Sequence, residues 1–179
     1  MNSGNPSRRR DEGQTSRDVV FSLGSNLGDC VEMLRTGVTS IARTSHLSIV
    51  SVSPAYRTVP VDAPPQPDFF NLIVLARSPL TPTAILERTQ AIERACGRVP
   101  DPDHGARPLD IDLIKVGDLT SDTEHLRLPH PRAAGRAFVL IPWLDIQPDA
   151  ELLGRKVADL AAGLDLSGIA KQFDIEITA

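Results

Sequence analysis

The fold class is decided by the stretch Asp18-Val-Val-Phe-Ser-Leu-Gly-Ser-Asn-Leu-Gly-Asp29, which predicts a strand, a tight turn and the start of a helix. Its first six residues are mostly apolar, as expected for a buried strand. Asp29 has the residue type of an N-cap, and apolar residues follow it at nearly helical spacing. Those apolar residues are Val31, Leu34, Val38 and Ile41. The folded part of the chain is therefore expected to begin with a strand followed by a helix.

Further strands and a second helix extend this start. Alternation of apolar and polar residues predicts a strand over 47–52, and the apolar run FFNLIVLA predicts a central strand over 69–76. Thr81 followed by Pro82 is typical of an N-cap and the first helical position, so a helix is expected there that ends near Gly97. Its apolar face is predicted to consist of Ile85, Leu86, Ile92 and Cys96.

A fourth strand over 109–116 completes a β-α-β-β-α-β order. We therefore predict an α+β fold, a ferredoxin-like αβ sandwich with one antiparallel sheet and a C-terminal extension. Helices would cover one face of the sheet, and the other face would be left for long loops and a ligand. In the extension we expect a helix over 138–146 that breaks near Pro142, a short helix over 157–162 and an edge strand over 173–177.

The composition is that of one soluble globular domain: 179 residues, of which 41% are hydrophobic and 23% charged. Residues 1–17 are polar and lack apolar periodicity, so we expect a disordered tail there and a single domain over 18–179. No apolar run approaches the ~20 residues that span a bilayer, and no secretory signal is visible. The only cysteines, Cys30 and Cys96, are expected to be free thiols, which favours the cytoplasm.

The net charge of −4 argues against a general nucleic-acid binder. The phosphate-binding patterns GxxxxGK(S/T) and GxGxxG are missing, and the histidines and cysteines lack the spacing of a zinc site. We expect a monomer with neither a nucleic-acid nor a membrane partner.

The most informative acids lie in the predicted fourth strand. Asp110 and Asp112 are two residues apart, so their side chains would share one strand face about 7 Å apart. Hard cations such as Mg²⁺ relieve the repulsion between two such carboxylates and bring phosphates with them. An exposed strand face with solvated acids explains the pattern equally well. Arg98 and Arg107 flank the loop before this strand and favour a site that holds a polyanion through metal and guanidinium groups together.

Other residues give weaker indications of a functional site when each is considered alone. Gln90 and Glu93 lie one turn apart on the predicted second helix, where a solvated face is the default interpretation. Asn71 lies inside an apolar strand, where Asn is depleted, and its amide suits either a structural hydrogen bond or recognition of a heterocycle. Phe69 shares its strand face and could stack on a flat ring, although a core phenylalanine is more common.

Several segments together resemble the 6-hydroxymethyl-7,8-dihydropterin pyrophosphokinase family of folate biosynthesis. In chain order they are Phe21-Ser-Leu-Gly-Ser-Asn-Leu-Gly-Asp29, Tyr56-Arg-Thr58, Gln66-Pro-Asp-Phe-Phe-Asn71, Gln90-x-x-Glu93, Gly97-Arg98, Asp103-His-Gly-Ala-Arg-Pro-Leu-Asp-Ile-Asp-Leu-Ile114, Leu128-Pro-His-Pro131 and Arg136-x-Phe138. The block 107–114, followed by Leu-Pro-His-Pro, is the most specific of these.

The resemblance implies a ferredoxin-like sandwich that transfers pyrophosphate from ATP to 6-hydroxymethyl-7,8-dihydropterin and releases AMP. It implies two Mg²⁺ ions, bound with ATP on Asp110 and Asp112. The implied ATP-site residues are Gln90, Glu93, Arg98, Arg107, His130 and Arg136. The implied pterin-site residues are Thr58, Val61, Phe69, Asn71 and Phe138. The implied catalytic residues are Arg98, Arg107, Asp110 and Asp112.

The segment 99–106 departs from the family pattern. Pro100 stands where the family often has a second arginine, and Asp103 and His104 stand where a basic and often an aromatic residue are usual. A catalytically weak relative is therefore one alternative. Two others are an RNA-recognition module, which the 4% aromatic content and the acidic composition oppose, and a magnesium-dependent phosphohydrolase, which would need no ring pocket.

Overall fold

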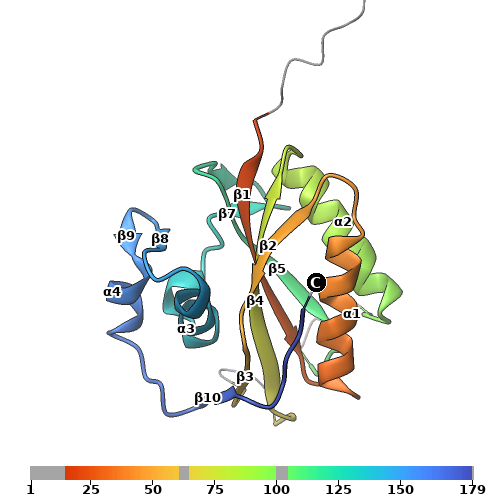
Figure 1. Cartoon of the computed structure of the whole chain (residues 1–179), viewed down its shortest axis with the longest axis vertical. Helices are drawn as coiled ribbons and strands as arrows, with labels where there is room; N and C mark the ends of the chain where they lie inside the picture. The colour runs from red at the N-terminus through yellow and green to blue at the C-terminus, as the bar shows by residue number, and fades with distance from the viewer. Residues whose placement is uncertain (1–14, 61–64, 100–104, 179) are drawn as a thin grey trace, which may run out of the picture.

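The computed structural model of this chain describes residues 15–60, 65–99 and 105–178. Within these ranges the chain forms a mixed α/β structure around one antiparallel sheet (Figure 1). Of the tail predicted over 1–17, residues 1–14 lie outside the described residues, and Arg17 already belongs to the first strand.

The main sheet has six strands in the order β10-β3-β4-β1-β5, and β2 also pairs with β4. The strands are β1 Arg17–Ser25, β2 Ser48–Val52, β3 Ala55–Thr58, β4 Phe69–Ser78, β5 Asp110–Val116 and β10 Ile169–Gln172. β1 and β4 pair along their whole lengths, from Arg17 opposite Ser78 to Ser25 opposite Phe70. The strands predicted over 18–23, 47–52, 69–76 and 109–116 are confirmed, and β4 is central.

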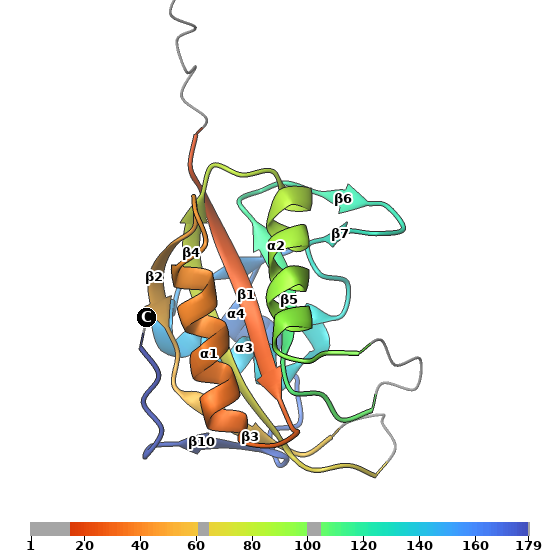
Figure 2. The ribbon, with the colours of Figure 1, turned by 90° about the vertical axis from the view of Figure 1, so that its right-hand side faces the viewer.

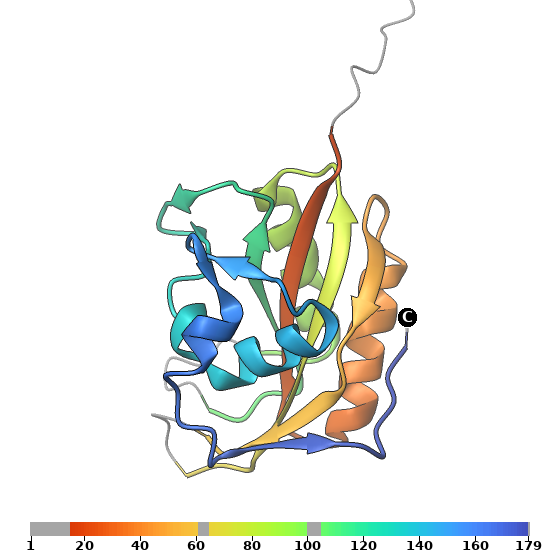
Figure 3. The ribbon, with the colours of Figure 1, turned by 60° about the vertical axis from the view of Figure 1, so that its left-hand side comes forward.

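Helices cover both faces of the sheet (Figures 1 and 3). The helices are α1 Cys30–Ala42 and α2 Pro82–Ala95 on one face, and α3 Ala137–Ile146 and α4 Val157–Ala161 on the other. The expectation that helices cover only one face is wrong, because α3 buries apolar side chains, Trp143 among them, against the second face.

Alternation of side chains along β1 explains why there are two cores. Phe21 and Leu23 point into the core under α1 and α2, which Figure 2 shows crossing the first face of the sheet. Val20 points to the opposite side, into the core formed with α3 and α4. A strand buried on both faces is apolar at successive positions, as residues 19–21 are.

Local signals set the ends of α1 and α2. Asp29 caps α1 by accepting a 3.0 Å hydrogen bond from the Glu32 amide. Thr81 caps α2 in the same way, accepting a 3.3 Å bond from the Ala84 amide. Gly97 follows α2 with a φ of +85°, a left-handed conformation that costs glycine little. These caps confirm the predicted starts of both helices.

Several expectations about the other elements are wrong. α3 continues through Pro142, because burial of α3 against the sheet outweighs the roughly 3 kcal/mol that an interior proline costs. The edge strand forms at β10 and not over 173–177, where Ile175 and Ile177 pack instead against the core under α1. The short helix predicted over 157–162 is confirmed as α4.

The buried face of α2 also differs from the predicted one. Ile85 is buried as expected, but its buried partners are Thr89 and Glu93. The remaining predicted core residues, Leu86, Ile92 and Cys96, pack only partly buried against the core. A polar residue is thus buried at the end of α2 that lies beside β5.

Smaller elements complete the described chain. They are the hairpins β6 Ser121–Asp122 with β7 Arg127–Leu128 and β8 Glu151–Leu152 with β9 Arg155–Lys156, and the 3₁₀ turn η1 Ala133–Gly135. Both cysteines are free, as expected. In the described part of the chain, no helix has the length and apolar character needed to cross a membrane.

Candidate functional site

The candidate site lies where β1 ends and β4 and β5 begin, at the lower end of the sheet in Figure 1. One row of paired residues crosses three strands there. Asp110 of β5 lies opposite Gly24 of β1, which in turn lies opposite Asn71 of β4. Neighbouring strands are about 4.8 Å apart, so the outer two residues of this row are separated by about 10 Å. An amide and a carboxylate therefore face the same site from either side of a glycine.

Arginines balance the charge of Asp110. Arg98 Nη1 donates a 2.5 Å hydrogen bond to Asp110 Oδ1, and Arg107 Nη1 lies 3.2 Å from Asp110 Oδ2. The Nε atom of Arg107 is buried and has no hydrogen-bond partner among the described residues. A buried donor left unpaired is costly, so the described residues leave one donor of this guanidinium unsatisfied.

Asp112 shares its strand face with Asp110 and lies beside two further basic side chains, Arg136 and His130. Arg136 Nη1 donates to Asp112 Oδ2 at 3.1 Å, and His130 Nε2 lies 3.9 Å from the same oxygen. Burial and the nearby charge of Asp110 raise the pKa of Asp112. Burial lowers the pKa of His130, against the opposing effect of Asp112. The residues predicted in 107–112 and 130–136 are therefore brought together.

Glu93 is a buried part of this cluster and not a member of a solvated helix face. Its side chain is 7% exposed, accepts a 2.7 Å hydrogen bond from the Ile111 amide and forms an ion pair with Arg98. Because β5 is at the edge of the sheet, this carboxylate supplies an acceptor that no strand offers. Burial raises the pKa of Glu93 to about 7.

The opposite side of the row is built on β3 and β4. Asn71 is buried, and its Nδ2 donates a 2.7 Å hydrogen bond to Oγ1 of the buried Thr58. Gly24 is required for this arrangement, since a Cβ at its position would lie 2.8 Å from Asn71 Oδ1. The amide oxygen of Asn71 therefore lies directly over the β1 backbone.

Two aromatic rings connect the halves of the site. The guanidinium of Arg107 lies 5.9 Å from the ring centre of Phe69, and that of Arg136 lies 5.3 Å from the ring centre of Phe138. Both rings are only partly buried, so each keeps accessible surface. The arginines that hold the two acids thus also contact the two predicted stacking residues.

Of the remaining predicted residues, only Gln90 lies in the part of the chain that the structure describes. Gln90 is exposed one turn before Glu93 on α2 and takes no part in the ion pairs described above. Val61, Asp103 and His104 lie outside the described residues, so the expectations for them stay predictions.

The sequence does not single out Asn26, a buried residue that hydrogen-bonds segments on both sides of the site. Its partners Gln66 and Arg107 are 40 and 81 residues away, whereas an asparagine between glycines predicts only a turn.

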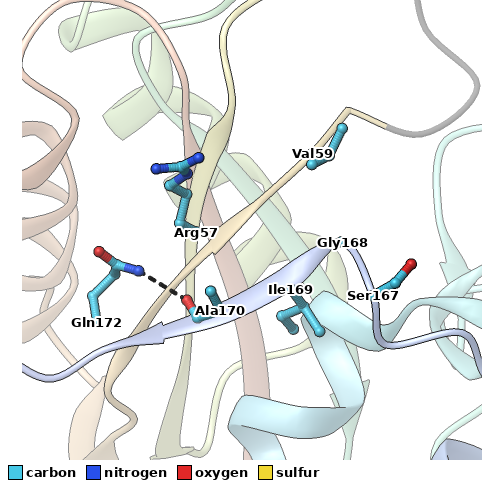
Figure 4. A pocket seen from close by; sticks show the side chains of 7 residues that line it. All are labelled: Arg57, Val59, Ser167, Gly168, Ile169, Ala170 and Gln172. Carbon is cyan, nitrogen blue, oxygen red and sulfur yellow. Dashed lines mark hydrogen bonds between the residues drawn. The ribbon is translucent and has the colours of Figure 1, made fainter.

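Two cavities lie near the site without enclosing the acids. One of about 260 Å³ lies between β3 and β10 (Figure 4), lined by Arg57, Val59, Ser167, Gly168, Ile169, Ala170 and Gln172. The other, of about 510 Å³, includes Asn26, Cys30, Pro67 and Phe70 in its lining. Neither is lined by Asp110 or Asp112, so the candidate site is defined by its charged groups.

The donor set fits a cation that arrives with a polyphosphate. Among the described residues, no group of three or more His, Cys, Asp or Glu side chains could hold a metal ion. Asp110 and Asp112 supply two carboxylates on one face. Mg²⁺ in proteins is commonly held by one or two carboxylates together with substrate phosphates and water.

Comparison with known proteins places this site in a family context. Residues 20–148 match the family model described as 7,8-dihydro-6-hydroxymethylpterin-pyrophosphokinase. The 2-amino-4-hydroxy-6-hydroxymethyldihydropteridine pyrophosphokinase of Methylorubrum extorquens is 40% identical over 86% of this chain and 97% of its own length. The protein of the same name from Pseudomonas aeruginosa is 36% identical over 86% of this chain and 95% of its own.

Solved structures agree on the fold. A Plasmodium falciparum HPPK-DHPS structure with SDX-DHP matches 85% of this chain with a TM-score of 0.67 and 14% identity. This chain covers 45% of the length of that protein, so the likeness concerns the fold of one part of it.

Proposed function

The chain belongs to the 7,8-dihydro-6-hydroxymethylpterin-pyrophosphokinase family, and from this we propose that it transfers pyrophosphate from ATP to 6-hydroxymethyl-7,8-dihydropterin in folate biosynthesis. The pterin hydroxyl oxygen forms a bond to the β-phosphorus of ATP, and the bond between the β-phosphorus and the bridging oxygen of AMP breaks. AMP, the pterin diphosphate and one proton are the products.

The observation that carries the proposal is the row Asp110–Gly24–Asn71. It supports a site in which a heterocycle binds on the β4 side and a polyphosphate on the β5 side, with a glycine between them. A separation of about 10 Å suits a flat ring and a phosphate held next to each other. A phosphohydrolase would need only the polyphosphate side of this site, on β5.

On the phosphate side, the arginines are assigned to bind and stabilise the polyphosphate. Arg98, held by Glu93, and Arg107, with its unpaired Nε, would receive the charge that develops on the leaving phosphate oxygens. Arg136 and His130 lie beside Asp112 and are assigned to the remaining contacts with ATP. Glu93 is assigned to holding Arg98.

Two Mg²⁺ ions are the cofactor that the carboxylates suit best, and Asp110 and Asp112 would hold them. When bound, these ions would neutralise phosphate charge. Each carboxylate is paired with an arginine, so these guanidinium groups would have to turn toward the phosphates when ATP binds.

On the pterin side, the Asn71 amide is assigned to hydrogen-bond the heterocycle, and Phe69 and Phe138 are assigned to stack on it. Thr58 holds the amide in place through its hydroxyl. The backbone at Val61 completes the proposed set.

The proposal extends to the fold type, the cellular compartment and the oligomeric state. The strand order β5-β1-β4-β2 supports a ferredoxin-like core. The free thiols of Cys30 and Cys96 support a reducing compartment, and we place the protein in the cytoplasm as a monomer.

Pterin-dependent formation of AMP tests the proposal. The protein is incubated with ATP and Mg²⁺, with and without 6-hydroxymethyl-7,8-dihydropterin, and the nucleotides are separated. AMP is expected only when the pterin is present. Release of inorganic phosphate without pterin would instead favour a phosphohydrolase.

A further inference from the structure

Asn26 links the chain segments that lead to the two halves of the site. The residue is 2% exposed. Nδ2 donates to Gln66 Oε1 at 2.8 Å and to the Pro67 carbonyl at 3.1 Å, while Oδ1 accepts from the Arg107 amide at 2.8 Å. The backbone amide of Asn26 donates to the Arg107 carbonyl at 3.2 Å. Both ends of the side-chain amide are therefore used.

The partners of Asn26 belong to different functional halves. Gln66 and Pro67 lie just before Asp68 and β4, the strand that carries Phe69 and Asn71. Arg107 precedes β5 and forms an ion pair with its first residue, Asp110. The two segments are about forty residues apart in the chain, and Asn26 joins them from the end of β1.

We propose that Asn26 is a positioning residue that holds the pterin-binding start of β4 and the phosphate-binding Arg107 in register with each other. This inference rests on the proposed function and assigns Asn26 no contact with substrate. In-line transfer requires the hydroxyl and the phosphorus to be aligned, and a misplacement of about 1 Å can lower a rate by about 100-fold.

The chemistry of an amide explains why this position suits asparagine. An amide offers two donor hydrogens and one acceptor oxygen on adjacent atoms. Aspartate would keep the acceptor for the Arg107 amide and lose both donors to Gln66 and Pro67. Leucine, with a similar shape, would lose both links. The two variants therefore separate the β4 link from the Arg107 link.

The experiment compares the wild-type protein with Asn26→Asp, Asn26→Leu and a matched control, Ser78→Ala. Ser78 is fully buried at the opposite end of β4, where its hydroxyl donates to the His46 carbonyl and accepts from the Leu80 amide. Its loss removes buried hydrogen bonds away from the site. The measurements are kcat, KM for each substrate, Tm, and backbone hydrogen exchange in residues 65–70 and 105–110.

Asn26→Leu is expected to lower kcat by about tenfold or more and to speed exchange in both segments. Asn26→Asp is expected to raise KM for the pterin more than KM for ATP and to speed exchange only in 65–70. Ser78→Ala is expected to lower Tm while keeping all kinetic constants.

The proposal is overturned if both Asn26 variants behave like Ser78→Ala in kcat and KM, or if exchange in the two segments is unchanged. Should Asn26→Leu fail to fold, Asn26→Asp still decides the outcome because its shape is nearly that of asparagine. A wild-type protein without activity would contradict the proposed function, whereas the exchange pattern would still decide whether Asn26 holds both segments.

Discussion

The two acids of β5 are balanced by guanidinium groups from separate segments of the chain. Arg98 and Arg107 come from before the strand, and Arg136 comes from the start of α3. If the acids hold Mg²⁺ and ATP, Asp110→Asn or Asp112→Asn should lower kcat by about 100-fold or more, because charge stabilisation is lost while shape is kept. Initial rates of AMP formation at saturating Mg²⁺ measure this.

The control for these variants is Asp118→Asn, which removes a fully exposed acid just after β5. It should leave kcat unchanged. Each acid in the site also partners an arginine, so a lower Tm is expected in Asp110→Asn and Asp112→Asn. Near-normal turnover in either of them would show that the acids do not hold the metal.

The buried carboxylate of Glu93 makes stability depend on pH. Its pKa in the folded protein is about 7, against an ordinary value of 4.5, so the folded protein keeps this proton over a range in which the unfolded chain has released it. The contribution of Glu93 to the free energy of unfolding therefore falls as pH rises from about 4.5 to about 7, by at most about 1.4 kcal/mol per pH unit.

Glu93→Gln removes this titration and keeps the shape of the side chain. Denaturant unfolding of both proteins between pH 4.5 and pH 8 should show the wild type losing stability relative to the variant up to about pH 7 and not beyond it. A difference between the two proteins that is constant over the whole range would contradict the assignment.

What the sequence predicts about single residues depends on how local the cause is. Asp110 and Asp112 share a face because of the two-residue period of a strand, which a sequence displays directly. The burial of Glu93 depends on the Ile111 amide, 18 residues away across the edge of the sheet. Without that partner in view, a glutamate on a helix predicts only a solvated face.

Between elements, the position of the Asn71 side chain over β1 depends on one glycine. Gly24→Ala would place a Cβ 2.8 Å from Asn71 Oδ1 and force the amide to move. Binding of the pterin, measured by calorimetry, is expected to weaken by about tenfold or more, with a smaller change for ATP. Gly163→Ala, whose Cβ would meet only the Leu160 carbonyl at 4.0 Å, should change neither affinity. Equal losses for both ligands would contradict the role of Asn71.

One partly buried contact joins β3, α3 and β10 behind the pterin half. The Tyr56 hydroxyl donates a 2.6 Å hydrogen bond to Asp145 Oδ2, which Lys171 Nζ also reaches at 3.0 Å. Burial and Asp145 raise the pKa of Tyr56, so the phenol stays protonated and donates. Tyr56→Phe should lower the free energy of unfolding by about 1 kcal/mol, since Asp145 would lose one hydrogen bond and keep its ion pair with Lys171.

Denaturant titration measures the effect of Tyr56→Phe. Tyr56 shares its strand with Thr58, so a larger effect on KM for the pterin than on KM for ATP would indicate that this contact also supports the pterin half. A free energy of unfolding within about 0.3 kcal/mol of the wild-type value would show that the hydroxyl does not stabilise the junction.

Elements that are specified by neighbouring residues were predictable. Asp29 and Thr81 predict the starts of α1 and α2, since a capping side chain accepts a hydrogen bond from an amide only three residues away. The positions of β10 and of the uninterrupted α3 could not be predicted in this way. β10 forms because it pairs with β3, and α3 continues through Pro142 because it is buried on the sheet. In both cases tertiary contact outweighs the local pattern.

At the scale of the whole molecule, the sheet is buried on both faces and the site occupies one end of it. The chain reaches that end several times, through β1, β3, β4 and β5, and then returns along its edge as β10 (Figure 3). The family motifs include the candidate site residues on these strands. They do not indicate which residue connects the strands, because the hydrogen bonds of Asn26 form only when three distant segments of the chain meet.

In the proposed reaction, the β- and γ-phosphates of ATP move together onto the pterin hydroxyl. The most direct measurement follows ATP labelled at the β-phosphorus in the presence of Mg²⁺ and 6-hydroxymethyl-7,8-dihydropterin. The label is expected to move to the pterin, and unlabelled AMP is expected to appear in equal amount. Label retained in ADP would mean transfer of the γ-phosphate alone and would contradict pyrophosphate transfer.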